Sequence, residues 1–263
     1  MSEINKRILE ISSFVNDCYI AQIKAFSKVE YAYINDIIRG NEISSVLDVG
    51  TGEGSFISRL ALDNTSVRFL AIDIDEVLIS CAKKKGKPNN LTFENTLFDS
   101  SFRNESFDLI LARFAVEHMT DVTQFIKEAF RRINSGGLLL ITEYYIDSLH
   151  SKSDEWKFFR EKELELYMKF GSHPRISLDI AVHMRVSGYK SIESSFRHIS
   201  PSTVGFENFY NLIISYANFY RSIEPEIWSE EVKKRVITYC KNSLNERNEN
   251  EDILLISHTI GRK

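Results

Sequence analysis

Three glycines at alternate positions, Gly50, Gly52 and Gly54, follow an apolar run in the segment SSVLDVGTGEGSF (residues 44–56). Glycine is required where φ is positive or where another group comes within contact distance of the main chain. The segment reads as a strand, a turn and the start of a helix, so a ligand at the turn would meet the free N–H groups of the helix. We therefore expect a ligand to approach the backbone at these glycines.

Two common ligand classes fit this turn poorly. A phosphate-binding P-loop needs Gly-Lys-Ser/Thr after the turn, whereas Gly54 is followed by Ser55 and Phe56. A dinucleotide site needs the spacing GxGxxG, and the third glycine here comes one residue early. The spacing therefore excludes the P-loop and weakens, without excluding, a nicotinamide site.

Two carboxylates follow at the ends of the next apolar segments. Asp73 ends VRFLAID, 23 residues after Gly50, and Asp99 follows LTFENTLF. Asp75 points the same way as Asp73 in an extended chain, but it is better placed to cap the helix DEVLISCA. A carboxylate has two acceptor oxygens and can bind both hydroxyls of a vicinal diol, which favours Asp73 as a ligand-binding group.

The spacing GxGxG preceded by Asp48 resembles motif I of the class I S-adenosylmethionine-dependent methyltransferases. The segments ESFDLILARFAVEHM and INSGGLLLITE follow in the order of that family, and the resemblance covers roughly residues 44–145. The resemblance implies that S-adenosylmethionine is the cofactor, that S-adenosylhomocysteine is the product, and that the methyl acceptor is a small molecule. In that family the amino acid and ribose parts of the cofactor approach the glycine turn.

The resemblance also assigns site residues. Asp73 would accept hydrogen bonds from the ribose hydroxyls, Asp99 from the adenine amino group, and Ser100 would contact the ring through its backbone, although Asp99 could equally start a turn. Arg113, a charge at the end of an apolar strand, needs a partner, either a substrate carboxylate or Asp48. The cofactor-binding residues so implied are Asp48, Gly50, Thr51, Gly52, Gly54, Asp73, Ile74, Asp99, Ser100, Arg113 and Phe114.

Catalysis by such an enzyme depends chiefly on positioning the acceptor in line with the methyl group, and a hydroxyl acceptor also needs a base. His118, Glu143 and Tyr144 are the candidate catalytic residues. His118 is often structural in this family, and Glu143 is either a pocket group or a capped carboxylate. Glu117 and His118 provide two possible ligands, too few for a metal site, so no metal is predicted.

Other charged residues are candidates for binding an anionic acceptor. His173 and Arg175, and likewise Arg197 and His198, are expected on loops, where either arginine would bind an anion in a two-pronged contact or pair with surface acids. The segment ARFA stands where an NPPY-like tetrapeptide would be needed to methylate an amino group of nucleic acid or glutamine. Nucleic acid is therefore not an expected substrate.

The elements that position these residues follow from hydrophobic periodicity. Short apolar runs alternate with helical patterns up to Tyr145, the signature of βαβ units, and two long helices and two further strands follow. We expect a doubly wound, Rossmann-like α/β fold. Its seven-stranded sheet should be mostly parallel, with an antiparallel C-terminal strand at the edge, where the last two strands form a hairpin.

Three regions are expected in the chain. An amphipathic helical lid occupies residues 1–40, the methyltransferase-like core comprises residues 41–200 and 251–263, and residues 201–250 form a helical insertion. The aromatic residues of this insertion would either cover the acceptor pocket, form the core of a small subdomain or form a dimer contact. Tyr19 and Tyr31 are weak candidates for cofactor contact from the lid.

Composition bounds the remaining possibilities. The 263 residues are 43% hydrophobic and carry a net charge of -4, so no global charge attracts nucleic acid. The three cysteines show no metal-like or disulfide-like spacing, and no apolar run is long enough to span a membrane. We expect a cytoplasmic monomer or homodimer. Two alternatives stay open: a non-catalytic protein that binds S-adenosylmethionine, and a nicotinamide-dependent oxidoreductase.

Overall fold

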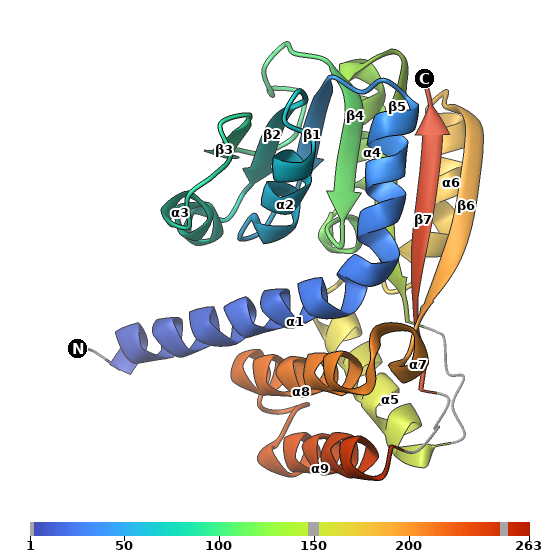
Figure 1. Ribbon diagram of the computed structural model, residues 1–263. Helices are drawn as coiled ribbons and strands as arrows, with labels where there is room; N and C mark the ends of the chain where they lie inside the picture. The colour runs from blue at the N-terminus through green and yellow to red at the C-terminus, as the bar shows by residue number, and fades with distance from the viewer. Residues whose placement is uncertain (1–2, 147–152, 248–251) are drawn as a thin grey trace. The chain divides into compact units, whose positions relative to one another are not determined.

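The computed structural model describes residues 3–146, 153–247 and 252–263 (Figure 1). The chain divides into two compact units, each assembled from three separate segments. The sheet unit comprises Tyr31–Tyr145, Arg175–Arg197 and Ile256–Lys263, and the helical unit comprises Met1–Glu30, Ile146–Pro174 and His198–Leu255.

The sheet unit is built on seven strands in the order β3-β2-β1-β4-β5-β7-β6. Strand β1 pairs in parallel with both β2 and β4, so the strand order reverses direction at β1. This confirms the predicted doubly wound fold. The strands are β1 (Ser45–Val49), β2 (Arg68–Asp73), β3 (Leu91–Asn95), β4 (Phe107–Arg113), β5 (Ile133–Tyr145), β6 (Lys190–Ile199) and β7 (Leu254–Arg262).

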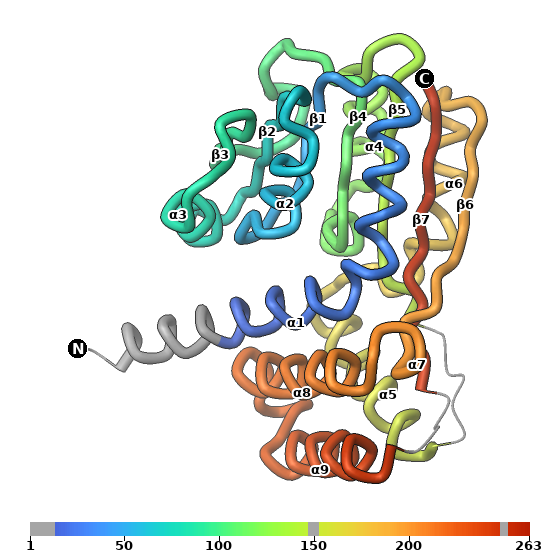
Figure 2. Tube along the Cα trace, viewed as in Figure 1, coloured from blue at the N-terminus to red at the C-terminus, as the bar shows by residue number. Residues whose placement is uncertain are grey.

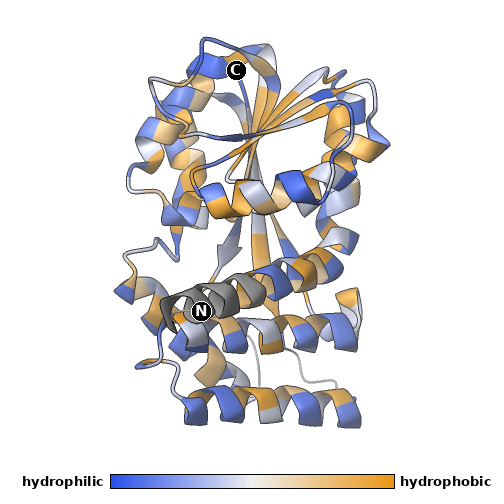
Figure 3. Ribbon diagram, turned by 90° about the vertical axis from the view of Figure 1, so that its left-hand side faces the viewer, coloured by the Kyte–Doolittle hydropathy of each residue, from blue (hydrophilic) through white to orange (hydrophobic). Residues whose placement is uncertain are grey.

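Both faces of the central strands are buried, as a parallel sheet covered by helices requires. Successive residues point to opposite faces, so Val46 belongs to one apolar cluster and Leu47 to the other. Figure 3 shows the strands coloured mainly as hydrophobic, which matches the near-continuous apolar runs in the sequence. The helices of this unit are α2 (Ser55–Asp63), α3 (Glu76–Lys84), α4 (Val122–Arg132) and α6 (Ile176–Val186), with a 3-10 turn η1 (Val116–His118).

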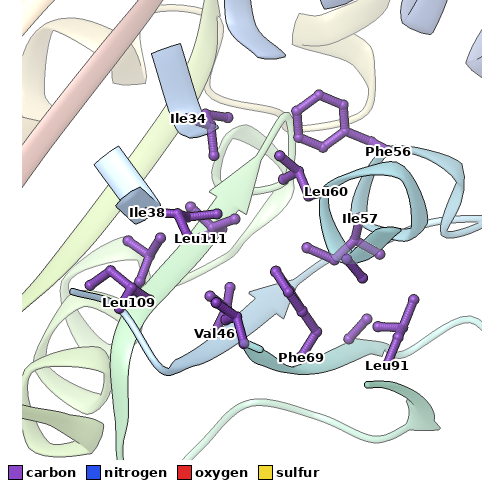
Figure 4. Packing of buried hydrophobic residues seen from close by; sticks show 14 of the residues in the cluster. Ile34, Ile38, Val46, Phe56, Ile57, Leu60, Phe69, Leu91, Leu109 and Leu111 are labelled. Atoms are coloured by element: carbon purple, nitrogen blue, oxygen red, sulfur yellow. The ribbon is translucent and has the colours of Figure 1, made fainter. Parts of the chain in front are cut away.

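The cluster that contains Val46 lies under helices α1 (Glu3–Gly40) and α2. In Figure 4, Ile34 and Ile38 of α1 and Leu60 of α2 point toward Val46 and Phe69 of the sheet. The buried apolar residues of α1 and α2 recur three or four positions apart along the chain. This spacing places apolar side chains on one face of a helix. This packing fixes α2, and hence the glycine turn that precedes it, against the sheet.

Strand β7 lies between β5 and β6 and runs antiparallel to β5. The amide of Lys263 donates to the carbonyl of Gly137 (3.0 Å), whereas Ser257 donates through its hydroxyl to the carbonyl of Glu143 (3.3 Å). Strands β7 and β5 therefore run in opposite directions. In Figure 1 the arrow of β7 points opposite to that of β4, which is parallel to β5. The two last strands lie side by side at the sheet edge, as predicted, with β6 outermost.

Three local expectations differ from the structure. Arg197 and His198 belong to strand β6, so their placement on a loop was wrong; this strand is polar and largely exposed. The last two strands form no hairpin, because residues 200–253 intervene. The C-terminal strand β7 lies between β5 and β6 rather than at the expected edge of the sheet, because β6 takes the outermost position.

The helical unit contains the aromatic residues expected in the insertion, together with residues 146–174, which the sequence analysis had placed in the core. Trp156, Phe159 and Trp228 are fully buried there. Arg160 pairs with Glu163 in this core, and Tyr220 donates to Glu163 (2.7 Å). The predicted boundary at residue 250 lies outside the described residues. The helices are α5 (Asp154–Lys169), α7 (Pro201–Val204), α8 (Phe206–Ile223) and α9 (Glu230–Glu246), which Figure 2 traces in the same view as Figure 1.

Among the described residues, no helix is both long and apolar enough to cross a lipid bilayer.

The packing in Figure 4 predicts the cost of opening a cavity in the core between α2 and the sheet. Phe69 is 1% exposed, so Phe69→Ala should lower the free energy of unfolding by about 3–5 kcal/mol. Leu62, which is 62% exposed on α2, is the matched control, and Leu62→Ala should change stability by less than about 0.5 kcal/mol. Urea unfolding of both variants measures the difference; equal effects would show that α2 is not packed as described.

Candidate functional site

The turn between β1 and α2 requires glycine for conformational reasons. Gly50, Gly52 and Gly54 have φ values of 77°, 59° and 76°, in the left-handed region that side chains disfavour. A Cβ atom on Gly50 would lie 2.5 Å from the Cβ of Ala115, and one on Gly54 would lie 2.5 Å from the ring of Phe93. The expectation that a ligand alone excludes side chains here was therefore incomplete, because neighbouring protein atoms already exclude them at two of the three positions.

Glu53, between the last two glycines, is a residue that the sequence analysis missed. It is 5% exposed, and its carboxylate accepts hydrogen bonds from the amide of Ser55 (3.2 Å) and from the Ser55 hydroxyl (2.5 Å). Lys85, just past the end of α3, pairs with the same carboxylate. Glu53 directly precedes Gly54, the N-cap of α2, and an acid near a helix N-terminus is favoured by the helix dipole, which was the available signal. Glu53 therefore fastens the turn to two helices.

Asp73 lies at the carboxyl end of β2, directly beside the glycine turn. Its Oδ2 accepts from the amide of Gly52 (2.8 Å) and its Oδ1 accepts from the amide of Asp75 (2.9 Å). Each carboxylate oxygen has a second lone pair, so the half-buried group can still accept two hydroxyl donors. Asp75 accepts hydrogen bonds from the amides of Val77 and Leu78, which confirms its predicted role as the cap of helix α3.

The end of β3 presents a second carboxylate with apolar neighbours. Asp99 Oδ1 accepts from the amide (2.8 Å) and hydroxyl (2.6 Å) of Ser101, so this acid does start a turn. These hydrogen bonds lower the pKa of Asp99. Ser100 is exposed beside it. Ile74 (71% exposed) and Leu97 (56% exposed) flank the turn, and Leu97 is a second residue that the sequence analysis did not select.

These apolar side chains lie close to Asp73. The carbonyl of Asp73 accepts from the amide of Thr96 (3.1 Å) and from the side chain of Asn95 (3.0 Å). Ile74 follows Asp73 and Leu97 follows Thr96, so the two exposed residues stand on adjoining loops. An exposed apolar surface beside two carboxylates suits a nucleoside, which has a flat ring and a hydroxylated sugar.

Asp48 lies in β1 just before the turn and is 6% exposed. Burial, with a smaller contribution from the charge of Asp73, raises the pKa of this carboxyl group to about 6, although a hydrogen bond from Thr51 and the positive charge of Arg113 act in the opposite direction. Arg113 therefore interacts electrostatically with Asp48, which was one of the two partners expected for Arg113. The site concentrates negative charge, which suits a cationic ligand.

The loop after β4 contains a strained aromatic residue. Phe114 has a φ of 52°, unusual for a bulky side chain, and its amide donates to the carbonyl of Thr142 (2.8 Å). Its ring stacks on Tyr144 with centroids 4.4 Å apart and planes at 23°. On the other side, the Arg113 guanidinium lies 4.6 Å from the centroid of Phe114 and 4.3 Å from that of Phe56. These four side chains form one continuous layer.

Glu143 holds this loop in place. Its Oε1 accepts from three consecutive amides, those of Ala115 (3.1 Å), Val116 (2.6 Å) and Glu117 (3.3 Å), and the residue is fully buried. Burial raises the pKa of Glu143 to about 8, while the three amides and Arg113 act in the opposite direction. Of the two roles expected for Glu143, the geometry favours the capped carboxylate over a pocket base.

The remaining candidates occupy distinct environments. The side chain of His118 is 57% exposed, its Nε2 lies 3.5 Å from Glu117 Oε1, and desolvation lowers its pKa, so the neutral imidazole dominates at neutral pH. Tyr144 is 7% exposed with its ring covered by Phe114. The Tyr31 hydroxyl donates to Asp63, which makes it a link between α1 and α2. Among the described residues, no group of three or more acids, histidines or cysteines is arranged to hold a metal ion.

Comparison with known proteins identifies the region that contains these residues. Residues 47–141, which contain the glycine turn, Asp73, Asp99, Arg113 and Phe114, match the family described as a methyltransferase domain. These residues form a methyltransferase domain. The recognition made from the sequence is thereby confirmed for this part of the chain.

Curated relatives of the methyltransferase domain match the same region. The demethylmenaquinone methyltransferase of Tropheryma whipplei is 32% identical over 100 residues, which are 38% of this chain and 41% of that protein. The ubiquinone/menaquinone biosynthesis C-methyltransferase UbiE of Bartonella quintana is 27% identical over 122 residues, 43% of this chain and 47% of that protein. The matches therefore span less than half of each of these relatives.

Solved structures resemble a larger part of the chain. The plantazolicin methyltransferase BpumL, solved with S-adenosylhomocysteine, has a TM-score of 0.57 at 16% identity, over 100% of this chain and 92% of that one. The sarcosine dimethylglycine methyltransferase described from Galdieria sulphuraria has a TM-score of 0.56 at 16% identity, covering 89% and 83%. At this level of identity the likeness establishes the fold.

The residues of the methyltransferase domain fit the predicted cofactor. Asp73 keeps acceptor capacity for a ribose diol, the two hydrogen bonds from Ser101 to Asp99 both use Oδ1, and Ile74 and Leu97 are exposed on the adjoining loops. The buried acid Asp48 adds negative charge where a sulfonium and an ammonium would enter. The donor set therefore matches S-adenosylmethionine in polarity, charge and shape.

The raised pKa of Asp48 predicts a stability cost in the ligand-free methyltransferase domain. A carboxyl group with a folded pKa of about 6 and an unfolded value of 3.8 favours the protonated state on folding, so its cost is complete above pH 6 and disappears below about pH 4. Asp48→Asn should raise the free energy of unfolding at pH 8 by roughly 1–3 kcal/mol and leave it unchanged at pH 4. Urea unfolding at both pH values tests this, and a gain of equal size at both would contradict it.

The three amides on Glu143 predict that its role is to accept hydrogen bonds. Glu143→Ala leaves those buried amides without a partner and should cost about 2–4 kcal/mol, whereas Glu143→Gln keeps a carbonyl oxygen and should cost less than about 1 kcal/mol at pH 6. Amide hydrogen exchange at residues 115–117 should accelerate in the alanine variant alone. Unchanged protection there would show that other contacts hold the loop.

Proposed function

We propose that the protein transfers a methyl group from S-adenosylmethionine to an oxygen or nitrogen atom of a small molecule. The observation that carries this proposal is the position of Asp73, bonded to the amide of Gly52 in the glycine turn while both its oxygens retain acceptor capacity. A carboxylate fixed in this way is preorganised for two vicinal hydroxyls, so it binds the sugar of the cofactor without rearranging.

The chain's own residues would divide the work around the cofactor. S-adenosylmethionine, when bound, supplies a methyl group on a positively charged sulfonium. Asp73 holds the ribose, Asp99 and the adjoining Ile74 and Leu97 hold the adenine, and Asp48 contributes negative charge near the amino acid part. Phe114 stands on the loop after β4, with its ring stacked on Tyr144 of β5, and this loop meets the glycine turn where Ala115 contacts Gly50.

The acceptor is proposed to be a small molecule because of the relatives. Curated relatives are named as a demethylmenaquinone methyltransferase, a ubiquinone/menaquinone biosynthesis C-methyltransferase and a malonyl-[acyl-carrier protein] O-methyltransferase. We propose His118 as the base when the acceptor is a hydroxyl, because its imidazole is neutral and its side chain is exposed.

Cofactor binding is the first test. Calorimetric titration with S-adenosylhomocysteine should give a dissociation constant in the micromolar range, and Asp73→Ala should weaken it at least about tenfold by removing the diol acceptor. Asp63→Ala is the matched control. Asp63 is an acid of the same domain at the end of α2 far from the glycine turn, where it accepts a hydrogen bond from Tyr31. Absence of binding to the wild type, or equal affinity of the Asp73 variant, would refute the proposal.

A second test separates the enzyme from the two alternatives. Turnover with S-adenosylmethionine on a panel of phenols, amines and carboxylic acids would establish transfer and identify the acceptor atom. Binding of S-adenosylhomocysteine without turnover on any acceptor would favour the non-catalytic binding protein. A change in NADH fluorescence on mixing, without binding of S-adenosylhomocysteine, would favour the oxidoreductase.

A further inference from the structure

Strand β6 leaves one edge of the sheet open. It is the outermost strand in the sheet order, and its ten residues, all of them described, extend from Lys190 to Ile199. Its inner edge lies on β7, where Ser194 and Thr259 share a hydrogen bond between hydroxyls (3.0 Å). The outer row of N–H and C=O groups therefore faces away from the sheet, where it can pair with another strand.

The features that usually prevent pairing at an edge are weak in this strand. β6 is longer than a typical strand and contains no proline, and the one left-handed residue within it is Ser191 (φ 48°), near its start. From Ile192 to Ile199 the strand is extended and most of its side chains are exposed. Phe196 is 45% exposed, with its ring 5.7 Å from that of Tyr145.

Glu193 and Arg197 lie on the same face of β6. They are four residues apart in an extended strand, where alternate residues share a face. Both residues lie close enough to influence Tyr33. The Arg197 guanidinium lies 5.5 Å from the centroid of the Tyr33 ring. Burial raises the pKa of Tyr33; the positive charge of Arg197 lowers it and the negative charge of Glu193 raises it. Neither residue forms an ion pair among the described residues, and both are exposed.

The positions of Glu193 and Arg197 allow two copies of β6 to match each other's charges. When two copies of β6 pair antiparallel around a two-fold axis at Ser195, residues whose numbers sum to 390 stand opposite each other. Glu193 of each copy then faces Arg197 of the other, which gives two opposite-charge pairs, and the two Phe196 rings come within diagonal reach. Shifting the axis to Ser194 or Phe196 places Glu193 opposite Ser195 or Ile199, so those registers lack the charge pairs.

We propose that β6 is an interface between two copies of this chain, which join antiparallel at Ser195 into a continuous fourteen-stranded sheet made from two sheets of seven. The interface is isologous, as a two-fold contact must be, because each copy contributes the same strand. Charge complementarity selects the second copy as the occupant, since a partner without this sequence would leave Glu193 and Arg197 unmatched. This proposal is independent of the methyl-transfer activity.

Charge reversal tests the proposed register. Sedimentation of the full chain from about 1 to 200 μM should show a reversible dimer. Glu193→Arg and Arg197→Glu each place like charges opposite one another twice, so each should weaken dimerisation by about tenfold or more. The double variant Glu193→Arg with Arg197→Glu restores both pairs and should return the dissociation constant to within about threefold of the wild type. Lys127→Glu, an exposed reversal on α4, is the control and should change nothing.

Cross-linking gives a second, geometric readout. Ser195→Cys places two thiols directly opposite across the two-fold axis, with Cβ atoms about 4.5–5.5 Å apart, and should form a disulfide-linked dimer under mild oxidation. Lys190→Cys is the control, because its two copies would be ten positions out of register, about 33 Å apart. A wild type that stays monomeric at 200 μM, a dimer unaffected by either charge reversal, or equal cross-linking at both positions would overturn the proposal.

Discussion

The contact between Gly50 and Ala115 is the constraint on which the site depends. The methyl group of Ala115 occupies the space that a side chain at residue 50 would need, so the turn after β1 and the loop after β4 fit together only without a Cβ there. These two turns lie on either side of the point where the strand order reverses, the place where open α/β sheets bind ligands. One close contact thus brings together the turn that would hold the cofactor and the loop that carries Phe114.

Two buried carboxylates maintain this arrangement from either side. Glu53 fastens the first turn to α2 and, through Lys85, to the end of α3, while Glu143 fastens the second loop by three amides. Glu53 is held by the amide and hydroxyl of Ser55 and by Lys85, and Glu143 by backbone amides alone, so contacts within the protein support both loops. The layer from Phe56 to Tyr144 is held in the same way, because Phe114 adopts a disfavoured backbone conformation only where its surroundings require it.

The parts of the fold that could be predicted were those encoded by local pattern. The apolar runs of β1, β2 and β4 and the acid at the end of β2 are each visible within a few residues, and the sheet and the methyltransferase domain followed from them. The reason for Gly50 could not be found in this way, since Ala115 is 65 positions distant. Glu143 left two roles open because its partners lie on another strand's loop, and Arg197 was misplaced because a polar edge strand has the composition of a loop.

Strand β7 has a consequence for how the protein is made. Residues 254–262 occupy a position between β5 and β6, so both of those strands remain unpaired on that side until this segment has left the ribosome. Throughout translation of the preceding helices, the nascent sheet exposes two open edges, a condition that invites aggregation and recruits chaperones. Completion of the sheet therefore waits for a segment that follows α8 and α9 in the chain, long after the glycine turn between β1 and α2 has been synthesised.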